Sequence, residues 1–187
     1  MDVVARLWLP MVVSAVFVFL ASSVIHMALK WHNREYRQLP DEDGVAAALR
    51  KAGAGPGQYV MPYCQDHKEL GNPDMLKKFT DGPVALLWLR APGKPSMGGP
   101  LAGWFVYNLV LAFFIAYLAG HVIQPGAHQY LQVFRVVGTV AFLAHGFGQV
   151  PNSIWMGKPW SATAKDLLDS LIYALLTAGA FGWLWPK

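Results

Sequence analysis

Hydrophobic residues along this chain are gathered into long blocks, separated by stretches that contain most of the charged residues. The blocks cover about residues 7–29, 101–120, 131–150 and 167–185. A helix that crosses the hydrocarbon core of a bilayer needs about 20 predominantly apolar residues, and each block is close to that length. The pattern therefore predicts an all-α membrane protein with four transmembrane helices.

The long polar stretch between the first and second blocks predicts a small α+β insertion. Its pattern predicts helices over about residues 45–51 and 73–79, and strands over about residues 59–64 and 84–89. Asn72 before Pro73 is typical of a helix start, and Asp41 or Asp43 is placed to cap the earlier helix. The chain then divides into an N-terminal transmembrane helix (1–29), a polar insertion (30–99) and a three-helix transmembrane region (100–187).

Basic residues gather in two of the three connections and predict how the chain is inserted. The connection at residues 121–130 contains no Lys or Arg. The bases near the other connections are Lys30, Arg34, Arg37, Arg90, Lys94, Lys158 and Lys165. Because cytoplasmic loops carry the excess of Lys and Arg, residues 30–99 and 151–165 are expected in the cytoplasm and both termini outside. The first block is expected to be an uncleaved anchor, since its bases follow it.

The composition excludes several classes of protein. Of the 187 residues, 55% are hydrophobic and 14% are charged, which is too apolar for an ordinary soluble domain. The net charge of +4 comes from bases interleaved with acids, so no nucleic-acid partner is expected. Cys64 is the single cysteine, so an intrachain disulfide and a multi-cysteine metal site are excluded.

With this orientation, each predicted helix places polar side chains in the same half of the bilayer. The cluster consists of His26, Asn108, His145, Gln149, Asn152, Asp169 and Tyr173. The three on the third helix follow one another at steps of four and three, which places them on one side. Such groups hold membrane helices together at about 0.6 kcal/mol each. Alternatively they form a proton, ion or metal site around His26, His145 and Asp169, or face a partner protein.

Two sets of residues suggest a cofactor. His26 and His145 are expected at similar depth, which permits axial ligation of haem. Cys64 and His67 are three residues apart and suit Cu(I) or zinc, with Met61 nearby. His32 and Met97 are further candidate ligands of that second set. Structural zinc sites normally have four protein ligands, so the alternative is a packed cysteine beside a surface histidine.

Small residues at steps of four indicate close packing of the helices. They are Gly99 with Gly103, Gly138 with Gly146 two steps on, and Ala174 with Ala178. These faces serve packing within the bundle or against other subunits. The sequence contains no Walker motif, GxSxG, HExxH or dinucleotide-binding fingerprint.

These features favour a non-enzymatic accessory or interaction subunit of a membrane complex. Its expected partners are the lipid bilayer and either other membrane subunits or further copies of the chain. Two alternatives stay open: a haem- or metal-binding redox protein that uses the intramembrane histidines, and a small transporter or proton path.

Several segments also resemble one group of proteins when they are taken together. They are SSVIHMALKWHNREYRQLPDED, GPLAGWFVYNLVLAFFIAYLAGH, FRVVGTVAFLAHG, NSIWMGKPWS and LIYALLTAGAFGWLWP. The chain resembles a group of small, uncharacterised bacterial membrane proteins with four spans. The resemblance covers most of the chain and implies a location in the bacterial inner membrane. It implies no activity and no catalytic residue.

Overall fold

The computed structural model of the chain describes residues 3–29, 31–123 and 130–186. It forms two compact units, one from residues 1–36 together with 96–187, and one from residues 37–95. Lys30, which was used to predict the orientation, and most of the connection between the second and third spans lie outside the described residues. The two units are described separately below.

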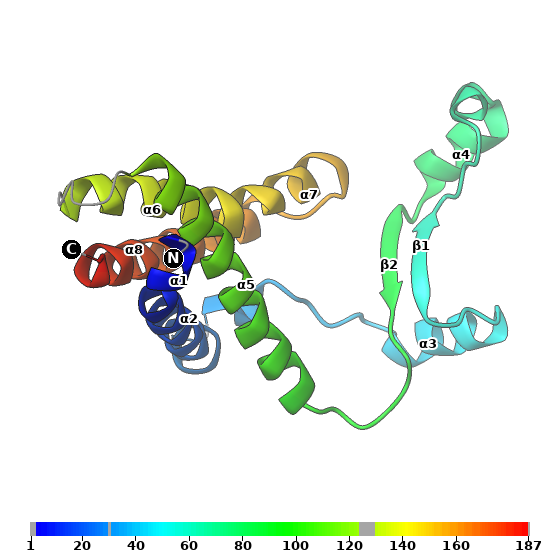
Figure 1. Cartoon of the computed structure of the whole chain (residues 1–187). Coiled ribbons are helices and arrows are strands. Elements are labelled where there is room, and N and C mark those ends of the chain that lie inside the picture. The colour runs from blue at the N-terminus through cyan, green and yellow to red at the C-terminus, as the bar shows by residue number, and fades with distance from the viewer. Residues whose placement is uncertain (1–2, 30, 124–129, 187) are drawn as a thin grey trace. The chain divides into compact units, whose positions relative to one another are not determined.

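The first unit contains four helices that are long and apolar enough to cross a membrane (Figure 1). Their bounds are Trp8–Leu29, Gly98–Val122, Tyr130–Trp155 and Trp160–Leu184. The elements that form them are α2 (Trp8–Ser23) with the π-helical η1 (Val24–Leu29), α5 (Gly98–Val122), α6 (Tyr130–Gly146) with the 3₁₀ turn η4 (Phe147–Gln149) and α7 (Val150–Trp155), and α8 (Trp160–Leu184). The short helix α1 (Val3–Arg6) precedes the first of them. The prediction of four helices that are long and apolar enough to span a membrane is thereby confirmed.

The third and fourth helices extend further than the sequence predicts. The third helix was expected to end near residue 150, but Pro151 lies in the first turn of α7, where the missing N–H costs no hydrogen bond. The fourth helix begins at Trp160, well before the expected start near residue 167, and its first turns contain Lys165 and Asp166. Both charged side chains have partners in the structure. Polar contacts therefore permit a helix where the hydropathy pattern alone predicts a connection.

Helices α6 and α8 make the most extensive contact in the bundle, and small residues allow their close approach. A Cβ atom on Gly138 would lie 3.2 Å from the Cβ atom of Ala178, and one on Gly146 would lie 3.0 Å from that of Ser170. Ala174 and Ala178 are fully buried. These small residues are thus used for packing within the chain.

Gly99 and Gly103 differ from the other small residues that were expected to pack. A Cβ atom on either would have no described atom within 4 Å. Among the described residues, these two glycines do not lie against another helix.

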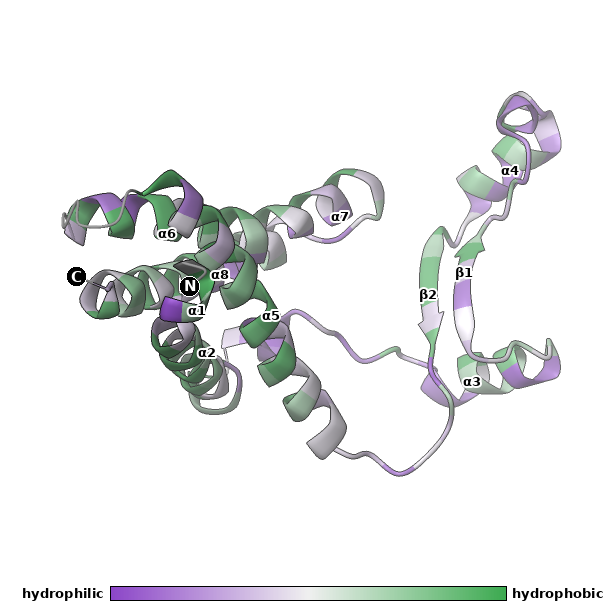
Figure 2. Ribbon diagram, in the orientation of Figure 1, coloured by the Kyte–Doolittle hydropathy of each residue, from purple (hydrophilic) through white to green (hydrophobic). Residues whose placement is uncertain are grey.

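The helices of the bundle consist largely of hydrophobic residues, which are green in Figure 2. Large hydrophobic side chains such as Phe114, Leu131, Leu175 and Trp183 are exposed. In water this surface would be unfavourable by about 25 cal/mol for each Å² of apolar area, whereas hydrocarbon solvates it. Length, composition and surface together indicate a multi-pass membrane protein.

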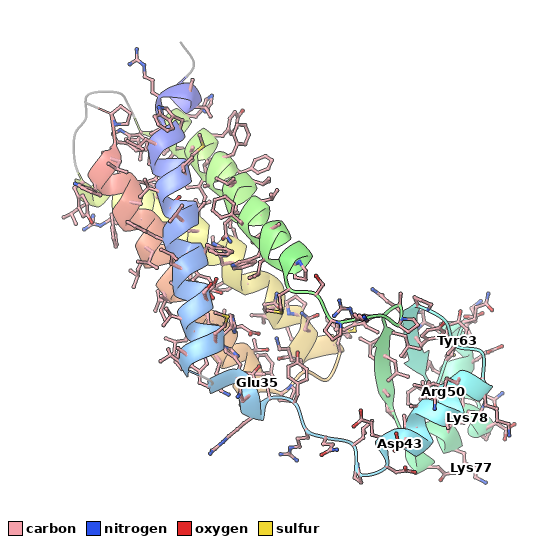
Figure 3. All side chains as sticks on the ribbon, turned by 90° about the horizontal axis from the view of Figure 1, so that it is seen from below. Glu35, Asp43, Arg50, Tyr63, Lys77 and Lys78 are labelled. Carbon is pink, nitrogen blue, oxygen red and sulfur yellow. The ribbon has the colours of Figure 1, made fainter. Side chains whose placement is uncertain are left out.

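The second unit is the small α+β insertion. It contains α3 (Glu42–Lys51), β1 (Gly57–Met61), the 3₁₀ turn η3 (His67–Gly71), α4 (Pro73–Asp81) and β2 (Ala85–Leu89). The two strands are antiparallel, with Gly57 opposite Leu89 and Met61 opposite Ala85. Neither α3 nor α4 contains a buried residue, and Figure 3 shows Asp43, Arg50, Lys77 and Lys78 among their charged side chains.

Local capping explains where the two helices of the insertion begin. The Asp41 side chain accepts a hydrogen bond from the Gly44 backbone N–H, and the Asn72 side chain accepts one from the Asp74 N–H. Each bond satisfies a backbone donor in the first turn that has no partner within the helix. The predicted caps at Asp41 and Asn72 are present in the structure.

Candidate metal and ligand site in the helix bundle

The chain changes its helical geometry where the first span ends, and this change brings two histidines together. His26 lies on η1, and His32 lies on the following 3₁₀ turn, η2 (Trp31–Arg34). Their ring centroids are 4.7 Å apart. A regular α-helix turns 100° per residue and would not place positions i and i+6 on one side. The π-helical segment and the tight turn are therefore what pair these two side chains.

His32 has a carboxylate partner at each of its ring nitrogens. Its Nε2 lies 2.8 Å from Oδ2 of Asp169 on α8, and its Nδ1 lies 2.7 Å from Oε1 of Glu35. Glu35 follows η2 just beyond the first span, where Figure 3 labels it. These side chains are mostly enclosed, with 15% of the His32 side chain and 6% of the Asp169 side chain exposed. Two carboxylate oxygens, one from Glu35 and one from Asp169, thus fix the position of the His32 imidazole.

Two lysines complete the charge pairing around this imidazole. Lys165 Nζ lies 3.3 Å from Oε1 of Glu35 and donates to the Trp31 carbonyl oxygen at 2.7 Å. Lys158, in the connection before α8, donates to Oδ2 of Asp166. The carboxylates of Glu35, Asp166 and Asp169 each contact a nitrogen that carries or can carry positive charge.

His26, His32 and Asp169 form a group with the geometry of metal ligands. One potential ligand atom from each lies within 4.8 Å of the other two. His26 Nε2 is 3.8 Å from Oδ2 of Asp169. In a tetrahedral zinc site, with bonds near 2.0–2.1 Å, ligand atoms are separated by roughly 3.3 Å. The distances from Asp169 Oδ2 to His26 Nε2 and to His32 Nε2, 3.8 and 2.8 Å, lie on either side of that spacing.

A cavity of about 620 Å³ lies beside this group, among the helices of the first unit. It is lined by His26, Pro100, Gly103, Trp104, Tyr107, His145, Gln149, Asp166, Asp169, Ser170 and Tyr173. Small-molecule sites typically have volumes of about 300–1,000 Å³ and combine aromatic walls with a few polar groups. The cavity fits that description.

His145 is surrounded by aromatic rings in this cavity. Its ring centroid lies 5.4 Å from that of Tyr173, 6.0 Å from that of Tyr107 and 6.4 Å from that of Trp104. Trp104 and Tyr107 are stacked, with centroids 5.3 Å apart and an interplanar angle of 18°. The indole N–H of Trp104 donates to Ser22 Oγ at 2.8 Å, which fixes the orientation of this pair.

Two buried side chains of the cavity have polar atoms without a partner among the described residues. They are Oδ1 of Asp169 and the hydroxyl of Tyr173, and each residue is 4% exposed. An unpaired buried polar group costs about 1–3 kcal/mol. Such groups are therefore candidate contacts for a bound molecule.

The other members of the predicted polar cluster have different surroundings. Gln149 lines the cavity, and its side-chain oxygen accepts from Asn152 Nδ2 at 3.3 Å. The 3₁₀ turn at residues 147–149 interrupts the regular helical step that was expected to align His145, Gln149 and Asn152. Asn108 donates to the Trp104 carbonyl oxygen at 2.8 Å and lines a separate, much smaller void.

The sequence analysis considered His26 and His145 as a pair of axial haem ligands, and in the structure each of them has other neighbours. Both residues line the cavity. However, the imidazole in contact with His26 is that of His32, and the rings around His145 are aromatic. The two groups of metal-ligand type found in the described residues are His26–His32–Asp169 and His32–Glu35–Asp166. Neither includes His145.

Cys64 and His67 are also outside these groups. The thiol of Cys64 donates to the backbone oxygen of Asp66 at 3.0 Å, and His67 begins the turn η3. Both lie in the insertion, whereas His32 and Met97 belong to the first unit. Within the described residues, no third His, Cys, Asp or Glu forms a metal-ligand group with Cys64 and His67.

The predicted polar cluster did not include Glu35, Asp166, Trp104 or Tyr107, and the sequence analysis considered His32 only as a further candidate ligand beside Cys64 and His67. The contact between His32 and Glu35 could have been predicted from the sequence, because side chains three residues apart can meet on a helical turn. The contact with Asp169 spans 137 positions and has no sequence signal.

Comparison of the chain with protein-family models, with curated proteins and with solved structures finds no match.

Proposed function

We propose that this multi-pass membrane protein binds a divalent transition-metal ion through His26, His32 and Asp169. The observation that carries the proposal is the convergence of two imidazoles and one carboxylate from three separate elements, η1, η2 and α8, within 4.8 Å. Two imidazoles and a carboxylate are a ligand set that zinc and non-haem iron proteins use.

The contact between Glu35 and His32 supports this proposal independently. Histidines that bind metals usually donate their second ring N–H to a carboxylate or carbonyl oxygen, which orients the ring and raises its basicity. Glu35 Oε1 at 2.7 Å from Nδ1 occupies that position, and leaves Nε2 on the side of Asp169 and His26. Lys165 contacts Glu35 and holds the supporting carboxylate in place.

The same contacts have an alternative explanation without a metal. A protonated His32 would donate one N–H to Glu35 and the other to Asp169, and so link the first span to α8 by an imidazolium between two carboxylates. Under this explanation His26 has no role, because its side chain is 51% exposed and lies 3.8 Å from Asp169. The test must therefore include His26.

Equilibrium metal binding distinguishes the two explanations. The chain is purified in a mild detergent, depleted of metal with a chelator, and titrated with Zn²⁺ against a chromophoric competitor. One Zn²⁺ per chain is expected, with binding lost in His32→Gln and reduced at least about tenfold in His26→Gln, because each removes one ligand. Replacing Zn²⁺ by Co²⁺ should give visible absorption bands that the same variants lose.

His67→Gln is the matched control, since it removes a histidine from the insertion and should leave Zn²⁺ affinity unchanged. Unchanged binding in His26→Gln and His32→Gln, with well-folded protein by circular dichroism, would contradict the proposal. Loss of binding in His67→Gln instead would indicate that the metal binds at Cys64 and His67.

The location, orientation and partners of the protein stay predictions. We propose the bacterial inner membrane, with residues 30–99 in the cytoplasm, on the distribution of basic residues. The accessory-subunit role was inferred in part from faces of small residues that could contact other subunits. Four of these residues pack within the chain, and they are Gly138, Gly146, Ala174 and Ala178. Haem ligation by His26 and His145 and a transport role also stay predictions.

A further inference from the structure

The cavity of about 620 Å³ contains features that the metal site does not use. Its ring of aromatic side chains and its unpaired polar atoms lie on α5, α6 and α8. The metal proposal shares only His26 and Asp169 with it. These features are suited to a second ligand, and the lining determines the charge, the shape and the hydrogen-bonding groups that this ligand must have.

Charge pairing favours a neutral ligand. Of the two carboxylates that line the cavity, Asp166 contacts Lys158, and Asp169 contacts His32 and belongs to the proposed metal site, so neither is left to pair with an organic cation. None of the described residues that line the cavity is Lys or Arg, so among them an anion also lacks a fixed counter-charge. Transfer of an unpaired ion into such a site is costly.

The shape of the lining favours a flat ring. Trp104 and Tyr107 form a stacked pair, and Tyr173 meets Trp104 at 61° with centroids 6.2 Å apart. Aromatic rings bind other rings in offset-stacked or edge-to-face arrangements, at centroid distances of about 4.5–7 Å. Gly103 leaves this wall open, because a Cβ atom there would meet no described atom within 4 Å.

The hydrogen-bonding groups favour oxygen atoms on that ring. Among the described residues, the Tyr173 hydroxyl has no partner and the ring nitrogens of His145 make no hydrogen bond. A hydroxyl and an imidazole N–H can donate to a carbonyl oxygen. Oδ1 of Asp169, also unpaired, can accept from a hydroxyl of a reduced ring.

We propose that this cavity binds the head group of a membrane quinone. A quinone is neutral, flat and lipid-soluble, with carbonyl oxygens on opposite sides of the ring, and it matches each of the three properties derived above. His145 and Tyr173 supply donors to the oxygens, and Trp104 and Tyr107 supply the face on which the ring stacks. The inference goes beyond metal binding and does not require the metal.

The test uses the full chain in lipid nanodiscs and decylubiquinone as the probe, with empty nanodiscs to measure partition into lipid. Saturable binding of one quinone per chain is expected above the linear partition. Gly103→Leu should weaken binding at least about tenfold, because the new side chain fills the cavity. Gly99→Leu is the matched control, since Gly99 also has open space around it but does not line the cavity.

His145→Leu provides a second variant, which removes the imidazole donor at nearly unchanged side-chain volume, and it should also weaken binding. Equal affinities in Gly103→Leu and Gly99→Leu, or binding that never saturates, would overturn the proposal. Equal affinity for decylbenzene, which has the tail and a ring but no oxygens, would also overturn it.

Repeating the titration after chelator treatment separates this proposal from the metal site. Quinone binding should persist without metal, so a failure of the metal proposal leaves the prediction unchanged. Conversely, loss of quinone binding in Gly103→Leu should leave the Zn²⁺ stoichiometry at one per chain if the metal proposal is correct.

Discussion

The imidazole of His32 and the carboxylate of Asp169 are in hydrogen-bond contact, with Nε2 2.8 Å from Oδ2, although 137 positions separate the residues. This contact joins the end of the first span to α8. Because Glu35 holds the opposite nitrogen, the position of the His32 ring is set from both sides.

Replacing Asp169 should destabilise the bundle more than replacing its neighbour Asp166. Removal of one partner from a buried charge pair costs about 3–5 kcal/mol, and 6% of the Asp169 side chain is exposed. Asp166 is more exposed and contacts a lysine near the surface, so its pair is worth about 0–1 kcal/mol. We expect Asp169→Leu to lower the free energy of unfolding by about 3 kcal/mol, and Asp166→Leu by less than about 1 kcal/mol. Reversible unfolding in mixed detergent micelles measures both, and equal losses would mean that the His32–Asp169 contact is not a stabilising link.

Glu35→Gln should weaken metal binding without abolishing it. Loss of an outer carboxylate that orients a metal-binding histidine typically reduces affinity about 10–100-fold. The glutamine retains an oxygen acceptor for His32 Nδ1 but not the charge. Competition titration with Zn²⁺ checks this, with Glu42→Gln as a control because Glu42 lies in α3 of the insertion. A loss in Glu35→Gln no larger than that in the control would indicate that Glu35 does not support a metal ligand.

Gly138→Leu should disrupt the packing of α6 against α8. The Cβ atom alone would lie 3.2 Å from that of Ala178, so the larger side chain cannot fit without separating the helices. Overpacking of this kind costs about 1–3 kcal/mol. Gly179→Leu on α8 is the control, since a Cβ there meets no described atom within 4 Å. Thermal denaturation followed by circular dichroism should show a lower midpoint for the first variant alone.

Cys64 should be protected from an impermeant maleimide in intact bacterial spheroplasts and should react after lysis. The expectation follows from the basic residues that flank the insertion, and the thiol is partly exposed. A Gly126→Cys substitution in a Cys64→Ser background should react in intact spheroplasts, because the connection at residues 121–130 contains no Lys or Arg. The reverse labelling pattern would invert the predicted topology.

The number and type of the main elements follow from the sequence by itself. An apolar run of sufficient length must form a helix in a bilayer, because hydrocarbon leaves each backbone N–H and C=O to find its partner within the chain. Capping residues such as Asn72 likewise mark helix starts through contacts with their immediate neighbours. These properties depend on residues close in sequence, so they can be read directly.

The site was decided by the tertiary structure. The sequence identified His26, His145 and Asp169 as polar residues at similar depth, but not the rotation of each helix about its axis, which packing sets through residues such as Gly138 and Gly146. That rotation brings Asp169 to His32 and leaves His145 among aromatic rings, whereas the π-helical segment after α2 places His26 beside His32. Local sequence thus fixes which residues are helical, whereas contacts between distant helices decide which side chains meet.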